Sequence, residues 1–366
     1  MPELTKEQAT EKIEELRENI RHHNYLYYVK AQPEISDREF DALMDELQEL
    51  EDRFPDLVTP DSPTRKVGGQ PVDEFETAEH LQPMLSIDNT YNEDELREWD
   101  DRVGRMLGDD ETWSYVIEPK IDGVAINLLY TDGSLERAIT RGDGRQGDDI
   151  THNAKTVRNL PLKLYTGSES DVESLDGSRM EIRGEIYMSF QTFERINRER
   201  EERGDALFAN PRNSTAGSLK QLDPNITARR GLEVFTYELG QVDGLDIPDS
   251  HRETLDLLNS LGCPVNPNAD ACDDIAEVIE RCDYWEEHNA ELGYPVDGLV
   301  IKIDSREQRE RLGYTSKHPR WMMAYKFAAE EQVTRVKEIR INVGKSGQLT
   351  PVAIMEPVQL SGTTVT

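Results

Sequence analysis

The sequence Glu118-Pro119-Lys120-Ile121-Asp122-Gly123 lies between two apolar runs, residues 113–118 and 123–130, that have the composition of β-strands. It sets three charged side chains at the end of one predicted strand and the start of the next. A K-x-D-G tetrapeptide is short, and taken alone it fits a salt-bridged strand end as well as a catalytic site.

Further charged motifs follow in a fixed order along the chain. Each places one or two charges in or beside a β-rich apolar run, where an unpaired charge would be costly. Their convergence on one polar cleft would explain all of them. The motifs are Arg141-Gly142-Asp143-Gly144, Arg183-Gly184-Glu185-Ile186, Asp297-Gly298-Leu299-Val300-Ile301-Lys302 and the segment from Trp321 to Lys326-Phe327.

The first 70 or so residues are predicted to be helical. Thr5 with Gln8, and Ser36 with Glu39, have the spacing of capping boxes, and each precedes apolar residues at helical intervals. Two helices are expected to pack as a small unit. The prolines of residues 59–64, followed by Gly68-Gly69, cannot continue a helix, and this segment is interpreted as a linker.

The pattern then changes to short strands with interposed helices. Thr131-Asp132-Gly133-Ser134 carries a hairpin turn signal, which favours antiparallel or mixed sheets over a regularly alternating parallel sheet. We therefore expect an α+β fold with a helical module with linker at residues 1–74, a main domain of sheets and helices at 75–328, and an unfinished small β domain at 329–366. The predicted strands are residues 113–118, 123–130, 135–140, 180–188, 232–239 and 299–303.

Composition limits the class of protein. The 366 residues carry 42 basic and 74 acidic side chains, a net charge of −32 with a mean hydropathy of −0.72. No stretch is apolar enough to span a bilayer and the N-terminus has no secretion signal, so a cytoplasmic protein without a membrane partner is expected. Only 13 of the 42 basic residues are lysines. A surface rich in carboxylates and poor in lysine stays soluble at high salt, where charge repulsion is screened, so we hypothesise a salt-rich cytoplasm.

Two other motif classes are disfavoured. Cys263, Cys272 and Cys282 form no C-x-x-C pair, which argues against a zinc ribbon, a disulfide framework and a dithiol site. Gly142-Asp143-Gly144-Arg145-Gln146-Gly147 satisfies G-x-G-x-x-G, but Asp148-Asp149 would place two negative charges where a dinucleotide pyrophosphate binds. We interpret it as a tight glycine loop that presents Arg141.

The ordered set K-x-D-G, R-G-E, D-G-L-V-I-K and Y-K-F resembles the covalent nucleotidyltransferases. Residues 208–223, Phe-Ala-Asn-Pro-Arg-Asn-Ser-Thr-Ala-Gly-Ser-Leu-Lys-Gln-Leu-Asp, are similar to a signature of the NAD-dependent DNA ligases, as are residues 59–64, 83–86 and 140–144. The resemblance covers essentially the whole chain. It implies a helical module that binds the nicotinamide mononucleotide (NMN) half of NAD, a nucleotidyltransferase domain, and the start of an OB-fold β-barrel.

The resemblance assigns Lys120 as the catalytic nucleophile. Its amine would attack the α-phosphate of NAD, release NMN and leave lysyl-AMP. Since an ordinary lysine is protonated at neutral pH, nearby cations and partial desolvation must favour the neutral amine, and Lys302 and Lys326 are expected to supply the cations. The same pair would stabilise the phosphate, alongside Mg²⁺ or Mn²⁺.

Other positions take family roles by the same resemblance. Asp122 and Asp297 would orient lysines or hold metal-bound water. Glu185 would hydrogen-bond the ribose, and Arg141 would contact ribose or phosphate. Ser86, Glu118 and the ring of Tyr237 would form the adenine pocket, although an ordinary strand aromatic is an equally good interpretation of Tyr237. Arg212 and Lys220 would contact phosphate and DNA. Lys220 stands where many members have arginine, so it keeps the charge but loses bidentate geometry.

In the helical module, Tyr27, Asp37 and Asp41 occupy the NMN motif. Asp37 and Asp41 are four residues apart and so share a helix face, which gives a cationic nicotinamide ring a reason to bind. Tyr28 and Phe40 depart from the histidine and tyrosine of some relatives. Packing between helices is the alternative role for these aromatic residues.

Zinc-finger, helix-hairpin-helix and BRCT domains of the family are expected beyond residue 366, and no metal site is assigned within the chain. We expect the chain to self-adenylate, to act on nicked double-stranded DNA as a monomer, and to seal nicks poorly. Two alternatives stay open. One is an ATP- or GTP-dependent relative, such as a polynucleotide ligase or capping enzyme, which would lack the N-terminal module. The other is a non-catalytic nucleic-acid scaffold.

Overall fold

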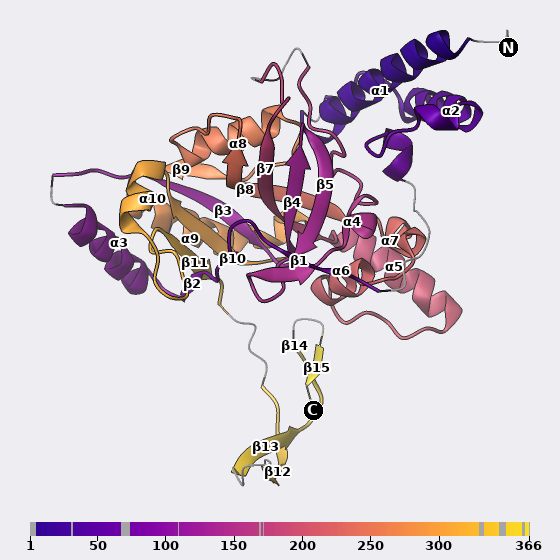
Figure 1. Ribbon diagram of the computed structural model, residues 1–366. Helices are drawn as coiled ribbons and strands as arrows, with labels where there is room; N and C mark the ends of the chain where they lie inside the picture. The colour runs from indigo at the N-terminus through magenta and orange to yellow at the C-terminus, as the bar shows by residue number, and fades with distance from the viewer. Residues whose placement is uncertain are drawn as a thin grey trace.

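The computed structural model has a mixed α+β architecture, as expected (Figure 1). A helical N-terminal module is followed by a body of two main sheets flanked by helices, and two short hairpins end the chain. The structure describes residues 5–30, 32–66, 74–108, 110–167, 170, 172–328, 333–343, 349–360 and 363–365.

The N-terminal module consists of α1 (Lys6–Tyr28) and α2 (Asp37–Arg53), which pack along one apolar face. Thr5 and Ser36 both form the predicted capping boxes, so the first orphan amides of each helix are satisfied. The small core joins the two helices through Ile13, Leu16, Ile20, Leu47 and Leu50, all of which are buried.

A buried ion pair closes this module. Arg17 Nη2 lies 2.6 Å from Glu51 Oε1, and both side chains are nearly inaccessible. The hydroxyls of Ser62 and Thr64 also donate to the Glu51 carboxylate. The expectation of a linker is therefore wrong for residues 59–64, because their hydroxyls satisfy a buried charge. Gly68-Gly69 lie outside the described residues. Two 3₁₀ turns, Pro55–Leu57 and Pro63–Lys66, complete the module.

Among the described residues, the module contacts the body of the molecule around Tyr165 and Lys163. The rings of Tyr25 and Tyr165 stack with centroids 4.4 Å apart. Beside them, Asp61 Oδ2 lies 3.7 Å from Lys163 Nζ. His22 Nδ1 also lies 3.3 Å from the Tyr165 hydroxyl, and Ser134 Oγ lies 3.5 Å from Asp61 Oδ2, so aromatic and polar contacts together join the module to the body.

The body is built from two main sheets that confirm the prediction of antiparallel and mixed pairing. One has the order β2-β11-β10-β3-β9 and the other the order β5-β4-β7-β8, and within them only β11 and β2 pair in parallel among the described strands. A small β1-β6 ribbon lies beside them. The bounds are β1 Thr77–Glu79, β2 Asp88–Thr90, β3 Tyr115–Ile121, β4 Val124–Thr131, β5 Ser134–Thr140, β6 Gln146–Asp148, β7 Arg179–Tyr187, β8 Glu233–Asp243, β9 Asp270–Cys272, β10 Val296–Ile303 and β11 Met322–Lys326.

The predicted Asp-Gly hairpin connects β4 to β5. Asp132 and Gly133 have φ angles of 50° and 72°, which is the left-handed pair that a two-residue turn of this hand requires. Glycine meets that requirement without strain, and aspartate tolerates it better than most residues do.

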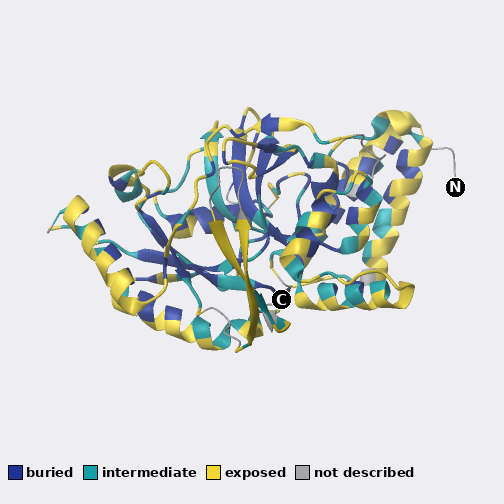
Figure 2. Cartoon of the chain, turned by 90° about the horizontal axis from the view of Figure 1, so that it is seen from below, coloured by how far each residue is buried: buried dark blue, intermediate teal, exposed yellow. Residues whose placement is uncertain are grey.

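Each main sheet has its own helical cover and its own core. The helices α3 (Glu93–Leu107), α9 (Ile275–His288) and α10 (Arg306–Leu312) pack on the five-stranded sheet. The four-stranded sheet shares a core with α4 (Thr151–Ala154), α5 (Phe190–Arg203), α6 (Pro211–Leu219) and α8 (His251–Ser260), and α7 (Pro224–Arg230) packs on α4 and α6. Figure 2 shows the buried strands between exposed helical faces. A 3₁₀ turn, Asn289–Leu292, follows α9.

The three cysteines lie within these cores. Cys263, Cys272 and Cys282 are buried and unpaired with one another. Burial raises the pKa of each thiol, to about 11 for Cys272 and further for the other two. They behave as small apolar residues, in agreement with the absence of a C-x-x-C pair.

The chain passes from one main sheet to the other at Asp122 and Gly123, between β3 and β4. A Cβ at Gly123 would lie 2.3 Å from the backbone oxygen of Ile186, so a side chain cannot fit there without moving β7. The glycine of K-x-D-G is thus required by the close approach of two strands. The crossing places Lys120, near the end of β3, beside both sheets.

The C-terminal segment forms two hairpins. They pair β12 (Val336–Val343) with β13 (Leu349–Met355), and β14 (Val358–Leu360) with β15 (Thr363–Val365). Ile339 and Ile341 of β12 are 67% and 62% exposed. In Figure 1 these hairpins, in yellow, lie apart from the main sheets.

Candidate active site

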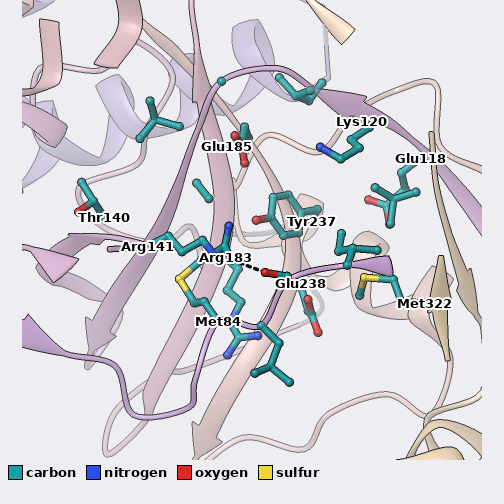
Figure 3. A pocket seen from close by; sticks show the side chains of 18 of the residues that line it. Met84, Glu118, Lys120, Thr140, Arg141, Arg183, Glu185, Tyr237, Glu238 and Met322 are labelled. Carbon is teal, nitrogen blue, oxygen red and sulfur yellow. Dashed lines mark hydrogen bonds between the residues drawn. The ribbon is translucent and has the colours of Figure 1, made fainter. Parts of the chain in front are cut away.

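A cavity of about 980 Å³ opens between the two main sheets. Figure 3 shows Lys120, Glu118, Glu185 and Tyr237 around it, contributed by β3, β7 and β8. The cavity brings together most of the residues that the sequence predicts for a site, from segments that lie far apart in the chain. They are Ser86, Glu118, Lys120, Arg141, Glu185, Arg212, Lys220, Tyr237, Asp297, Lys302 and Lys326.

Lys120 faces a β-bulge in the neighbouring strand. The register between β3 and β10 shifts between Val296 and Leu299, which leaves Asp297 and Gly298 opposite Lys120. Asp297 Oδ1 lies 3.3 Å from Lys120 Nζ, and Asp297 Oδ2 forms an ion pair with Lys326. Burial and the nearby charge of Lys120 lower the pKa of Lys326, while Asp297 opposes that shift. One carboxylate thus holds two lysines side by side.

Glu118 anchors a second, more deeply buried cluster. Its Oε1 atom lies 2.7 Å from Lys302 Nζ and 2.8 Å from His251 Nε2. Burial opposes ionisation, but Lys302 and His251 together lower the pKa of Glu118 to about 2. Lys302 also donates to the backbone oxygen of Tyr237 at 3.0 Å, and its Nζ lies 5.2 Å from the centroid of that ring. The charge of Lys302 is therefore balanced within the cluster.

Glu185 has an unusual protonation state for a carboxyl group. Burial raises its pKa to about 8, although Lys120 and Arg212 act in the opposite direction. At neutral pH this side chain is mainly a neutral acid that can donate as well as accept a hydrogen bond. Arg212 forms an ion pair with Asp122 at 2.5 Å, next to the strand crossing.

The rim of the cavity carries Arg141 and Ser86. Arg141 Nη2 donates to Ser86 Oγ at 2.7 Å. Gly142 and Gly144 have positive φ angles, and strand β6 begins at Gln146 where a dinucleotide fingerprint would begin a helix. The interpretation of this G-x-G-x-x-G as a tight loop is thereby confirmed.

The segment that leads to Ser86 is tied to β7 by charged side chains. Arg183 Nη2 donates to the backbone oxygens of Gln82 and Pro83, at 3.0 and 3.2 Å. Glu181 accepts from the backbone amide of Leu81 at 2.7 Å. These bonds hold residues 81–83, and with them the approach to Ser86, against the sheet.

Lys220 lies at the outer edge of the cavity. Its Nζ is 3.0 Å from Asp148 Oδ2, and both side chains are well exposed. An exposed pair of this kind contributes little to stability. It leaves Lys220 accessible to an incoming anion.

The NMN-motif residues are not brought to the cavity. Tyr27 is 52% exposed on α1, where its ring meets that of Tyr28 edge-on at 4.9 Å. Asp41 is exposed on α2. Asp37 begins α2, but its side chain lies outside what the structure describes.

No group of three or more metal-ligating side chains stands together in the described part of the chain. A cation held mainly by phosphate oxygens and water, with one or two carboxylates, is compatible with that arrangement. Among the described residues, no helix is long and apolar enough to cross a bilayer.

His251 is the site residue that the sequence did not reveal. It is 2% exposed and follows the N-cap Ser250 at the start of α8. Burial and the nearby Lys302 lower its pKa to about 4, so the ring is neutral. A single histidine far from every motif gives no spacing signal, and only the fold brings it to Glu118.

Comparison with known proteins gives one consistent family. The family described as NAD-dependent DNA ligase adenylation domain matches residues 72–330. The DNA ligase-like, N-terminal NAD+-binding domain matches residues 6–68, and the NAD-dependent DNA ligase OB-fold domain matches residues 333–366.

Curated relatives agree with these matches. The DNA ligase of Desulforamulus reducens is 51% identical over 359 residues, covering 98% of this chain and 52% of that protein. The DNA ligase of Carboxydothermus hydrogenoformans is 48% identical over 363 residues, covering 99% and 53%. The chain thus spans about half the length of these relatives. A solved mycobacterial DNA ligase D complexed with ATP and MES, 16% identical with a TM-score of 0.34 over 70% of this chain and 63% of that one, is too distant to support an argument.

Proposed function

We propose, since this chain belongs to the family of NAD-dependent DNA ligases, that Lys120 takes AMP from NAD as the first step of DNA nick sealing. The observation that carries the proposal is the pairing of Lys120 with Asp297 and Lys326 at the cavity between the two main sheets. A lysine held this way is oriented, partly desolvated and next to a second cation that can meet a phosphate.

The first step exchanges one bond for another. Lys120 Nζ forms a bond to the α-phosphorus of NAD, the bond from that phosphorus to the bridging oxygen breaks, and NMN leaves with its own phosphate. The amine of Lys120 gives up a proton, and Asp297 Oδ1, which lies 3.3 Å from Lys120 Nζ, would accept it. In the following steps AMP passes to the 5′-phosphate of a nick, and the 3′-hydroxyl displaces it as the strand is sealed.

The other cavity residues have proposed roles that follow from their positions. Glu118, Ser86 and Tyr237 would receive the adenine base. Glu185, as a neutral acid, and Arg141 would hold the ribose. Lys326, beside Lys120, would meet phosphate oxygens, whereas Lys302 would stay with Glu118 at the base end of the cavity. Arg212, positioned by Asp122, and the accessible Lys220 would contact phosphates of DNA.

We propose Mg²⁺ as the metal, with Mn²⁺ as a substitute. Asp297, which lines the cavity, and Asp122, which pairs with Arg212 beside it, are the carboxylates that would hold its water molecules. When bound, the metal would neutralise charge on the phosphates. Zinc is expected only in the family's domains beyond residue 366.

The helical module, proposed as residues 1–74, would bind the NMN half of NAD through Tyr27, Asp37 and Asp41. Residues 75–328 would form the nucleotidyltransferase domain and 329–366 the start of the OB-fold. We expect a cytoplasmic monomer that acts on nicked double-stranded DNA. We expect these 366 residues to form lysyl-AMP but to seal nicks poorly.

Intact mass spectrometry tests the first step. The purified chain is incubated with Mg²⁺ and either NAD or ATP, with folding followed by circular dichroism. We expect a gain of about 329 Da, one AMP, with NAD alone, lost in Lys120→Ala and kept in the control Lys317→Ala, at an exposed lysine that does not line the cavity. A folded chain that gains no mass, after treatment to remove any bound AMP, contradicts the proposal, and a gain from ATP alone points to the ATP-dependent relatives.

A further inference from the structure

His251 is buried where three charged side chains from three other elements meet. Its Nε2 atom lies 2.8 Å from Glu118 Oε1 on β3 and 3.1 Å from Lys302 Nζ on β10. On the opposite side of the ring, Nδ1 lies 3.4 Å from Arg309 Nη1 on α10. The role of a neutral imidazole here depends on which of its nitrogens carries the proton.

The neighbours of the ring decide the tautomer. The guanidinium of Arg309 can only donate, so Nδ1 must be the bare nitrogen that faces it. Nε2 then carries the hydrogen and donates it to Glu118 Oε1. Lys302 also only donates, so its contact with Nε2 is not a hydrogen bond, and its own hydrogens go to Glu118 Oε1 and to the Tyr237 backbone oxygen.

These bonds treat the two oxygens of Glu118 differently. Oε1 accepts from both Lys302 and His251, and these two bonds fix the orientation of the carboxylate. In the part of the chain that the structure describes, no group donates a hydrogen bond to Oε2. Glu118 lines the cavity, so Oε2 is the acceptor that this cluster leaves for a ligand.

We propose that His251 is a positioning residue that fixes Glu118 so that Oε2 accepts a hydrogen bond from the exocyclic amino group of the adenine base. The inference rests on the proposed function and deepens it, because it assigns the base selectivity of the site to a residue outside the motifs. His251 itself touches no reacting atom.

The selectivity follows from hydrogen-bond chemistry. An ionised carboxylate has no hydrogen to donate, so it pairs with the amino group of adenine but faces the carbonyl oxygen of hypoxanthine acceptor to acceptor. A site built to accept a hydrogen bond discriminates strongly against a ligand that cannot provide it. The discrimination is sharp only if the carboxylate cannot turn away, and the bond from His251 restrains it.

A matched pair of variants tests the role. Glutamine places an amide near the position of Nε2 and can still donate to Glu118, whereas methionine has a similar length and no donor. The rate of AMP attachment is measured in single turnovers against the concentration of NAD and of its hypoxanthine analogue. His288→Gln, at a histidine stacked on Tyr284 at the end of α9, is the control.

We expect His251→Met to raise the half-saturating concentration of NAD by roughly tenfold, with a much smaller change in the maximum rate, and to reduce the preference for NAD over the analogue. His251→Gln should restore most of both. A wild-type chain that uses both dinucleotides equally well, or a methionine variant with unchanged preference, overturns the inference. A wild type that attaches no AMP contradicts the proposed function instead.

A second measurement does not depend on the folding of a variant. In ¹⁵N-edited NMR of the folded wild-type chain, the two imidazole nitrogens of a neutral histidine have well-separated shifts, and the assigned His251 ring should show a hydrogen on Nε2 and a bare Nδ1. A hydrogen on Nδ1 would mean that the ring cannot donate to Glu118, and the inference would then be wrong.

Discussion

Asp297 reaches Lys120 from a β-bulge, and its two oxygens face two different lysines. Oδ1 lies 3.3 Å from Lys120 Nζ, while Oδ2 binds Lys326. A regular strand would direct successive side chains to opposite faces, and the extra residue in β10 breaks that alternation here. The bulge therefore places a carboxylate between the nucleophile and the second lysine.

The charge of Asp297 should matter more to the rate than to the fold. Asp297→Asn keeps the shape but removes the ion pairs and the proton acceptor, and we expect self-adenylation at saturating NAD to slow by roughly 10²-fold or more. Rapid-quench intact mass spectrometry gives the rate, with the exposed Asp205→Asn as control. A rate within a factor of two of wild type would remove Asp297 from the mechanism.

Glu185 predicts a pH dependence of stability. Its pKa is about 8 in the folded chain against 4.5 for an ordinary glutamate, so the folded state binds more protons between about pH 4.5 and pH 8. The stabilisation it contributes is therefore complete below that range and is lost as the pH rises through 8. The Glu185→Gln side chain is neutral at every pH. The unfolding temperature of this variant should therefore rise relative to that of the wild type, by a few degrees between pH 5 and pH 8. A constant difference would show that the folded-state pKa is not raised.

The buried Arg17–Glu51 pair predicts a non-additive double mutant. Glu51→Leu removes the buried partner of Arg17 and leaves it the exposed Glu14 and the Leu57 backbone oxygen, and it should destabilise the helical module by about 3–5 kcal/mol. Adding Arg17→Met removes the stranded charge, and most of that loss should be recovered. Hydrogen exchange in α1 and α2 measures the effect locally. Equal exchange rates in the single and double variants would argue against a coupled pair.

Two glycines give a matched test of the strand crossing. Gly123→Ala would place a Cβ against the oxygen of Ile186, and we expect a loss of about 1–3 kcal/mol together with slower self-adenylation. A Cβ at Gly217 in α6 meets nothing within 4 Å, so Gly217→Ala should stabilise the chain by about 0.5–1 kcal/mol. Chemical denaturation compares the two. A neutral Gly123→Ala would show that β7 can move at no cost.

The sequence predicted the elements whose signals are local. The capping boxes at Thr5 and Ser36, the Asp-Gly turn and the main strands depend on neighbours a few residues apart, and the structure confirms them. The motif order also predicted a shared cleft, because charged residues in several apolar strands need partners. The salt-rich habitat inferred from composition stays a prediction.

The features that could not be predicted from the sequence depend on contacts between segments that are far apart in the chain. Ser62 and Thr64 resemble linker residues until Glu51 is placed beside them, and His251 has no motif at all until α8 meets β3. Asp297 was expected to orient lysines, but the β-bulge that directs it toward Lys120 arises from the pairing of β10 with β3, which the sequence does not show. Tyr27 and Asp41 lie away from the cavity, and their part in NAD binding stays a prediction.

The three buried cysteines can report local unfolding of the two cores through the accessibility of their thiols. Each thiol is shielded and has a raised pKa, so alkylating reagents at neutral pH should find no reactive sulfur while the cores stay closed. Cys263 lies in the core of the four-stranded sheet, and Cys272 and Cys282 lie in that of the five-stranded sheet. The order in which labels appear under mild denaturant would therefore tell which half of the catalytic body loosens first. A fourth cysteine introduced on the surface could carry a fluorophore without replacing any of these three.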